Sequence, residues 1–174
     1  MNNANASPGG DLIDHVVGLT SDDALYATRH AREKVATATQ GSYELFFDPA
    51  AGGLTLPERL LVAYYACVLS ASPDLENHYL GLLRQNDVDT ATLEAVGGNR
   101  PELLKPGRLP ALLAFTATLI LKPIEGDQAA AQALQAAGIA TPDIITLAQL
   151  IAFLSYQIRL VAGLQAMKAL ESQS

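Results

Sequence analysis

Three stretches of this chain are apolar on most sides of a helix. Residues 60–69 (LLVAYYACVL) and 109–121 (LPALLAFTATLIL) contain hardly any polar side chain, and apolar residues recur at helical spacing on two faces of residues 144–164. A helix without a polar face must be surrounded by protein. The pattern therefore predicts helices over 55–69, 109–121 and 141–170, with the first of them at the centre of a core.

Helix-starting residues support these boundaries. Thr55-Leu56-Pro57-Glu58 combines a capping residue, a proline in the first turn and a glutamate at the capping-box spacing. The sequence Ser70-Ala71-Ser72-Pro73 then breaks the chain, and Ser72-Pro73-Asp74 starts a helix to about Asn86. Shorter helices are predicted at 11–19, 22–39, 89–96 and 127–137, and residues 40–47 as a helical turn whose aromatic rings enter the core.

The predicted fold class is all-α: a helical bundle with several short helices around a buried central helix, and a long C-terminal helix. Hydrophobic residues make up 49% of the 174 residues and aromatic residues only 6%, so alanine and leucine supply the core and favour helix over strand. We expect residues 1–10 to be a flexible leader and 11–174 a single domain. A domain of this size can bury only one or two all-apolar helices, so the remaining apolar surface predicts an oligomer.

The charge distribution argues against nucleic acid and anionic membranes as partners. The net charge of −7 is spread along the chain, and the nearest basic cluster, residues 29–34, contains its own acid and is expected to be a solvated helix face. No uninterrupted run of about twenty apolar residues predicts a membrane span. A single cysteine fits a reducing compartment, so a cytoplasmic location is expected. No spacing predicts a metal site, and no motif predicts a cofactor.

The order of these segments resembles the carboxymuconolactone decarboxylase-like superfamily, which includes the alkylhydroperoxidase D-like (AhpD-like) proteins. The resemblance rests on Leu54-Thr55-Leu56-Pro57-Glu58-Arg59 before the buried helix, the break followed by His78, and the closing segment from Ala137 to Phe153. With Asp11 to His15 and Ser42 to Phe46 it covers nearly the whole chain, and it is strongest to the branch of CMD domain proteins. The resemblance implies an AhpD-like helical bundle.

In the peroxidase members of this superfamily, a Cys-x-x-Cys pair at the break acts with a glutamate and a histidine. Glu58 matches the glutamate, and His78 matches the histidine within one residue. Counting from either residue places Ala71 and Asp74, or Ser70 and Pro73, where the cysteines would stand. None of these side chains can form and resolve a sulfenic acid, so dithiol peroxidase activity of the family type is not expected.

Each candidate site residue has a structural and a functional interpretation. Glu58 completes a capping box or accepts a proton at the floor of a pocket, and the two roles are compatible. His78 is satisfied by Asp74 one turn earlier, or it is a general acid or base. Tyr65 and Tyr79 are packing residues whose hydroxyls find a partner, or they contact a ligand.

These observations lead to three functional hypotheses. The first is a degenerate, non-redox superfamily member that serves as a structural or small-ligand-binding subunit, either as a homo-oligomer or with a peroxidase-like relative that keeps its cysteines. The alternative is an acid-base enzyme of the decarboxylase or isomerase kind, in which Glu58 and His78 move protons on a small organic acid under Tyr65. A one-cysteine peroxidase using Cys67 is the third, but Cys67 lies inside the apolar helix and is expected to be a buried small residue.

Overall fold

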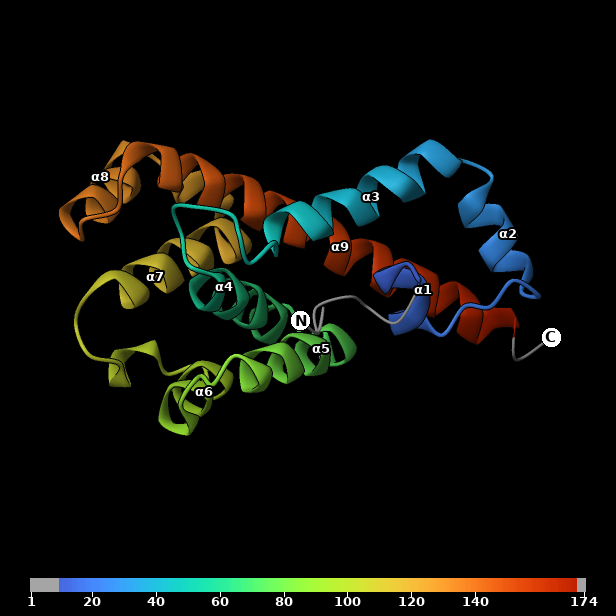
Figure 1. Cartoon of the computed structure of the whole chain (residues 1–174), viewed down its shortest axis with the longest axis horizontal. Helices are drawn as coiled ribbons and strands as arrows, with labels where there is room; N and C mark the ends of the chain where they lie inside the picture. The colour runs from blue at the N-terminus through green and yellow to red at the C-terminus, as the bar shows by residue number, and fades with distance from the viewer. Residues whose placement is uncertain (1–9, 172–174) are drawn as a thin grey trace. The chain divides into compact units, whose positions relative to one another are not determined.

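The computed structural model describes residues 10–171, and over this range the chain is helical without a strand. The all-α prediction is therefore confirmed. The predicted leader lies, apart from Gly10, outside the described residues. The α-helices are α1 Leu12–Val17, α2 Ala24–His30, α3 Glu33–Phe46, α4 Leu56–Leu69, α5 Pro73–Gln85, α6 Thr90–Gly97, α7 Arg108–Leu121, α8 Gln128–Ala136 and α9 Thr141–Glu171, with 3-10 turns η1 Pro101–Leu103 and η2 Pro123–Glu125 (Figure 1).

The described residues divide into two compact units. Residues 10–45 and 159–171 form unit 1, and Phe46–Ile158 form unit 2. α9 contributes its first part to unit 2 and its last part to unit 1. A domain is defined by its ability to fold alone, which such a division does not decide. The single domain predicted for 11–174 stays a prediction.

α4 is the buried centre of unit 2, as its sequence predicts. Every residue from Arg59 to Cys67 is buried, and α4 packs against α5, α6 and α7 (Figure 1). The capping box at its start is also confirmed, because the Glu58 amide donates to the Thr55 hydroxyl at 3.3 Å and the Thr55 amide donates to the Glu58 carboxylate at 2.8 Å. The helix therefore begins where the capping residue places it.

A buried arginine fixes the segment that enters α4. The Arg59 guanidinium donates to the backbone carbonyls of Phe46 at 2.6 Å, Asp48 at 3.0 Å and Thr55 at 3.4 Å. These bonds satisfy a charge that would otherwise be costly to bury. They hold residues 46–55 against the first turn of α4, although nothing in the local sequence distinguishes Arg59 from an exposed helix-start residue.

The two other apolar helices differ in how fully they are covered. On α9 the predicted stripe is buried at Leu147, Ile151, Leu154, Ile158 and Val161. By length and composition α9 is also the one described helix that could cross a membrane, a test that buried core helices pass as well. α7 is buried along one side only, and its last residue, Leu121, is exposed.

The single helix predicted over 22–39 is wrong. The chain turns at Ala31-Arg32, so that α2 ends at His30 and a separate helix, α3, begins at Glu33. Asp23 occupies the position before α2. The break contains neither glycine nor proline, and the contacts that hold α2 come instead from ion pairs with α1, described below. Residues 40–46 are helical as predicted but belong to the end of α3.

Candidate functional site

Glu58 lies in the first turn of α4 with both carboxylate oxygens occupied. Oε2 accepts from the Thr55 amide at 2.8 Å and from the Thr55 hydroxyl at 3.1 Å, and Oε1 accepts from Arg108 Nε at 3.0 Å. Burial raises the pKa of Glu58, but the hydrogen bonds from Arg108 and Thr55 and the charge of Arg108 outweigh it and lower the pKa below its ordinary value. A carboxylate stabilised in this way is a weak proton acceptor.

His78 lies on α5, which follows α4 across a short break and packs beside it. Its ring is half-buried and meets the edge of the Tyr79 ring, with the centroids 5.1 Å apart. Neither residue lines the pockets described below. A shared acid-base role for these two residues stays a prediction.

The two tyrosines proposed for ligand contact use their hydroxyls inside the protein. Tyr65 donates to Asn99 Oδ1 at 2.7 Å, and Tyr79 donates to Gln157 Oε1 at 2.6 Å in a fully buried bond. Burial raises the pKa of Tyr65. Both side chains therefore connect α4 or α5 to other parts of unit 2, and neither lines the two pockets described here.

Cys67 is completely buried in the last turns of α4. Burial is the main cause that raises the pKa of its thiol, and the charge of Glu76 raises it further. A thiolate is the reactive form of cysteine, and this environment strongly disfavours it. The burial expected for Cys67 is confirmed.

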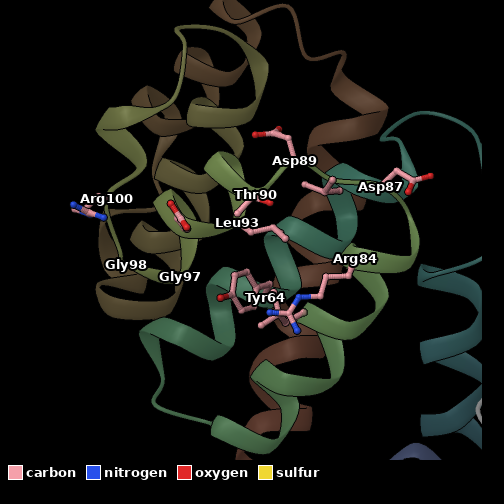
Figure 2. Close-up of a pocket in the computed structure, with 12 residues that line it drawn as sticks. Tyr64, Arg84, Asp87, Asp89, Thr90, Leu93, Gly97, Gly98 and Arg100 are labelled. Carbon is pink, nitrogen blue, oxygen red and sulfur yellow. The ribbon is translucent and has the colours of Figure 1, made fainter.

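A pocket of about 850 Å³ opens between α5, α6 and the side of α4 (Figure 2). We call it the Tyr64 pocket. Its apolar wall comes from Leu80, Val88 and Leu93, together with the Tyr64 ring. Charged residues surround this wall, and they are Arg84, Asp87, Asp89, Glu94 and Arg100.

The Tyr64 hydroxyl is the distinctive polar group of this pocket. Tyr64 is only 4% exposed, and its hydroxyl has no hydrogen-bond partner among residues 10–171. Figure 2 shows the hydroxyl directed toward Gly97, where any side chain would collide with it. Burial raises the pKa of Tyr64, the charge of Glu76 raises it further, and Arg84 lowers it. At neutral pH the phenol is therefore protonated and able to donate.

A second pocket, of about 590 Å³, lies on the other side of α6 and shares Asp89, Glu94 and Arg100 with the first. Its charged residues, including Lys105, are all exposed. None of its polar side chains is buried, so it offers less reason for a ligand to bind.

Unit 1 contains an ion-pair cluster that the sequence does not predict. Arg29 contacts Asp11 at 2.9 Å and Asp14 at 2.7 Å, and His30 Nε2 lies 2.7 Å from the second oxygen of Asp14. Tyr26 stacks on the His30 ring, with the centroids 4.1 Å apart. The solvated face predicted for residues 29–34 is thus wrong for Arg29, whose side chain is 6% exposed. Because the Arg29 guanidinium pairs with two aspartates at the start of α1, the cluster holds α2 on α1.

The sequence predicts a ligand contact at Tyr65, whereas its neighbour Tyr64 lines the pocket. Tyr64 and Tyr65 are neighbours on a helix with no polar face, and only the packing of α5 and α6 decides which hydroxyl reaches a pocket. Gly97-Gly98 indicates a helix end in the sequence, whereas the structure shows that Gly97 also makes room for Tyr64. Within residues 10–171, no group of three His, Cys, Asp or Glu side chains is placed to hold a metal ion.

Comparison with known proteins adds no family assignment. No family model matches the chain, and no curated protein matches it significantly. Functional inference therefore depends on the residues of this chain and on the geometry of the Tyr64 pocket.

Proposed function

We propose that this chain is a non-redox member of the carboxymuconolactone decarboxylase-like superfamily that binds a small organic ligand as a subunit of an oligomer. The order of its helices supports the proposed relationship. A buried central helix carries Glu58 in its first turn, a short break and a second helix follow it, and α9 is a long helix after them. This is the arrangement that the sequence resemblance implies.

The state of the only cysteine supports a function without thiol chemistry. Cys67 is the single cysteine in the sequence, and it is fully buried. A dithiol cycle needs a second thiol to resolve the sulfenic acid, and the chain has none. A one-cysteine cycle would require peroxide to reach the interior of α4.

The observation that carries the ligand-binding function is the Tyr64 hydroxyl. The Tyr64 side chain is buried except at its hydroxyl, which keeps access to solvent in the pocket, because no buried side-chain oxygen or nitrogen within residues 10–171 lacks a partner. Tyr64 lacks such a partner among the described residues and faces a pocket large enough for a small molecule. A bound ligand would replace water as the acceptor for this hydroxyl.

Exposed apolar side chains of unit 2 support the oligomer. Leu121, Ile124 and Ile145 are exposed, and Ile124 is 94% exposed. Apolar surface of this kind is often covered by another chain. The partner in this proposal is a second copy or a relative that keeps its cysteines, in the cytoplasm. Light scattering at micromolar concentration is expected to show an assembly, and a monomer would contradict this part of the proposal.

Two assays test the function itself. Hydroperoxide consumption with a thiol reductant should not exceed the protein-free rate, and catalytic consumption would overturn the non-redox proposal. A thermal-shift screen of small organic molecules should give stabilising compounds for the wild type. Those shifts should disappear in Thr90→Trp, which fills the Tyr64 pocket, and persist in Ala133→Trp on the exposed face of α8. Shifts that survive Thr90→Trp would place the ligand elsewhere.

A further inference from the structure

We propose that the Tyr64 pocket binds a monocarboxylate on an apolar body, with the Tyr64 hydroxyl and the Arg84 guanidinium holding the carboxylate. The inference rests on the ligand-binding function proposed above and names its ligand class. It follows from the donors, the wall and the rim charges of the pocket.

The two donors lie on the same side of the pocket. Figure 2 shows the Arg84 side chain extending toward Tyr64, and Arg84 is close enough to lower the pKa of that phenol. Arg84 has no ion-pair partner among residues 10–171. A phenol and a guanidinium both donate hydrogen bonds, and a guanidinium matches the two oxygens of a carboxylate. An oxyanion is therefore the group that satisfies both residues.

The wall of the pocket favours an apolar body behind that oxyanion. Leu80, Val88 and Leu93 line the pocket beside the Tyr64 ring, and Leu93 is itself buried. Covering such a wall removes apolar surface from water, which favours binding. An anion without an apolar part would leave this wall exposed to water.

The rim charges favour a ligand with one negative charge. Asp87, Asp89 and Glu94 also line the pocket, and they outnumber Arg84 and Arg100. Asp89 is occupied in part, because it accepts from Thr92 at the start of α6. A phosphate monoester carries about −1.5 to −2 charges at neutral pH and would be repelled more strongly than a carboxylate. The charge balance therefore selects the monocarboxylate.

Calorimetric titration with three related probes tests this ligand class. The probes are 3-phenylpropanoate, its neutral amide 3-phenylpropanamide, and phenyl phosphate. The carboxylate should bind roughly tenfold more tightly than the amide, because a hydrogen bond to a charged group is worth more than a neutral one. Phenyl phosphate should bind more weakly than the carboxylate. Equal affinity for carboxylate and amide, or tighter binding of the phosphate, would overturn the inference.

Single substitutions then assign the two donors. Tyr64→Phe removes only the hydroxyl, and Arg84→Gln removes the charge; each should weaken carboxylate binding roughly tenfold without the same effect on the amide. Tyr26→Phe and Arg32→Gln, both in unit 1, are matched controls that should bind as the wild type does. Unchanged carboxylate affinity in both pocket variants would overturn the assignment.

The outcomes separate this inference from the function on which it rests. If none of the three probes binds but other compounds give thermal shifts that Thr90→Trp abolishes, the monocarboxylate class is wrong and the pocket remains a ligand site. If no compound gives such a shift, the ligand-binding function is wrong, and the inference fails with it.

Discussion

Replacing Glu58 by glutamine separates the structural role of this residue from a catalytic one. The substitution keeps the shape of the side chain and an oxygen that can still accept from Thr55, so part of the capping box survives. It removes the charge that Arg108 contacts at 3.0 Å. It also removes a negative charge from the first turn of α4, where the helix dipole favours one.

The expected loss follows from these two contributions. The ion pair is partly exposed, with Arg108 at 38% and Glu58 at 15% exposure, so its contribution is about 0.5–1 kcal/mol. The dipole and the charge-assisted cap add about 0.5–1 kcal/mol. For a chain of 174 residues, a total near 1.5 kcal/mol lowers the melting temperature by about 3–6 °C.

The effect should depend on pH with a defined sign. The pKa of Glu58 is lowered in the folded protein, because the hydrogen bonds and charge of its partners outweigh burial. Its contribution is therefore complete above the ordinary carboxyl pKa of 4.5 and is lost as the pH falls through the folded pKa. Urea unfolding should show a clear difference between the wild type and Glu58→Gln at pH 7, and a smaller one at pH 3.

Glu102→Gln provides the control, since Glu102 is exposed in η1 and has no ion pair among the described residues. It should change the free energy of unfolding by less than about 0.5 kcal/mol. If Glu58→Gln is as stable as the wild type at pH 7, the cap and ion-pair account of Glu58 is wrong. If Glu58→Gln abolishes an enzymatic activity of the wild type without lowering its stability, the acid-base enzyme is favoured instead.

Substitutions at three further sites test a buried hydrogen bond, a buried arginine and a strained backbone position by urea unfolding. Tyr79→Phe should cost about 1–2 kcal/mol of unfolding free energy, because Gln157 Oε1 loses its buried donor. Adding Gln157→Leu should recover part of this loss. Additive effects of the two substitutions would show that the bond contributes nothing. Arg59→Met should cost about 3–5 kcal/mol because it removes three hydrogen bonds from a buried charged group to backbone carbonyls. The Thr55 and Asp48 carbonyls keep backbone donors, and a loss below about 1 kcal/mol would refute the anchoring role of Arg59. Ala71 has a φ of 50°, so Ala71→Gly should stabilise the folded protein by about 0.5–1 kcal/mol. As the control, Ala114→Gly within α7 should destabilise it by about 1 kcal/mol. Destabilisation by both substitutions would contradict backbone strain at Ala71.

Local signals in the sequence predict most of the helices. Thr55 and Glu58 place the start of α4, and Asp127 and Gly138 bound α8, because capping and left-handed residues act within a few positions of themselves. The buried stripe of α9 follows from helical periodicity alone, since every core contact of a helix repeats at the same spacing.

Contacts between distant residues account for what the sequence does not predict. Asp14 and Arg29 lie fifteen positions apart, and no local pattern pairs them or predicts the turn at Ala31. The anchoring role of Arg59 depends on the carbonyls of a preceding loop. The choice of Tyr64 over Tyr65 as the pocket residue depends on how α5 and α6 cover α4, which periodicity cannot specify for a helix that is apolar all round.

Mapping ligand-induced shifts by two-dimensional NMR tests the central claim most directly. On titration with 3-phenylpropanoate, the amide signals of Arg84, Gly97 and Gly98 should move together, while those of Glu58 and Arg108 stay unchanged. Shifts centred on Glu58 and His78, with none at the Tyr64 pocket, would contradict it.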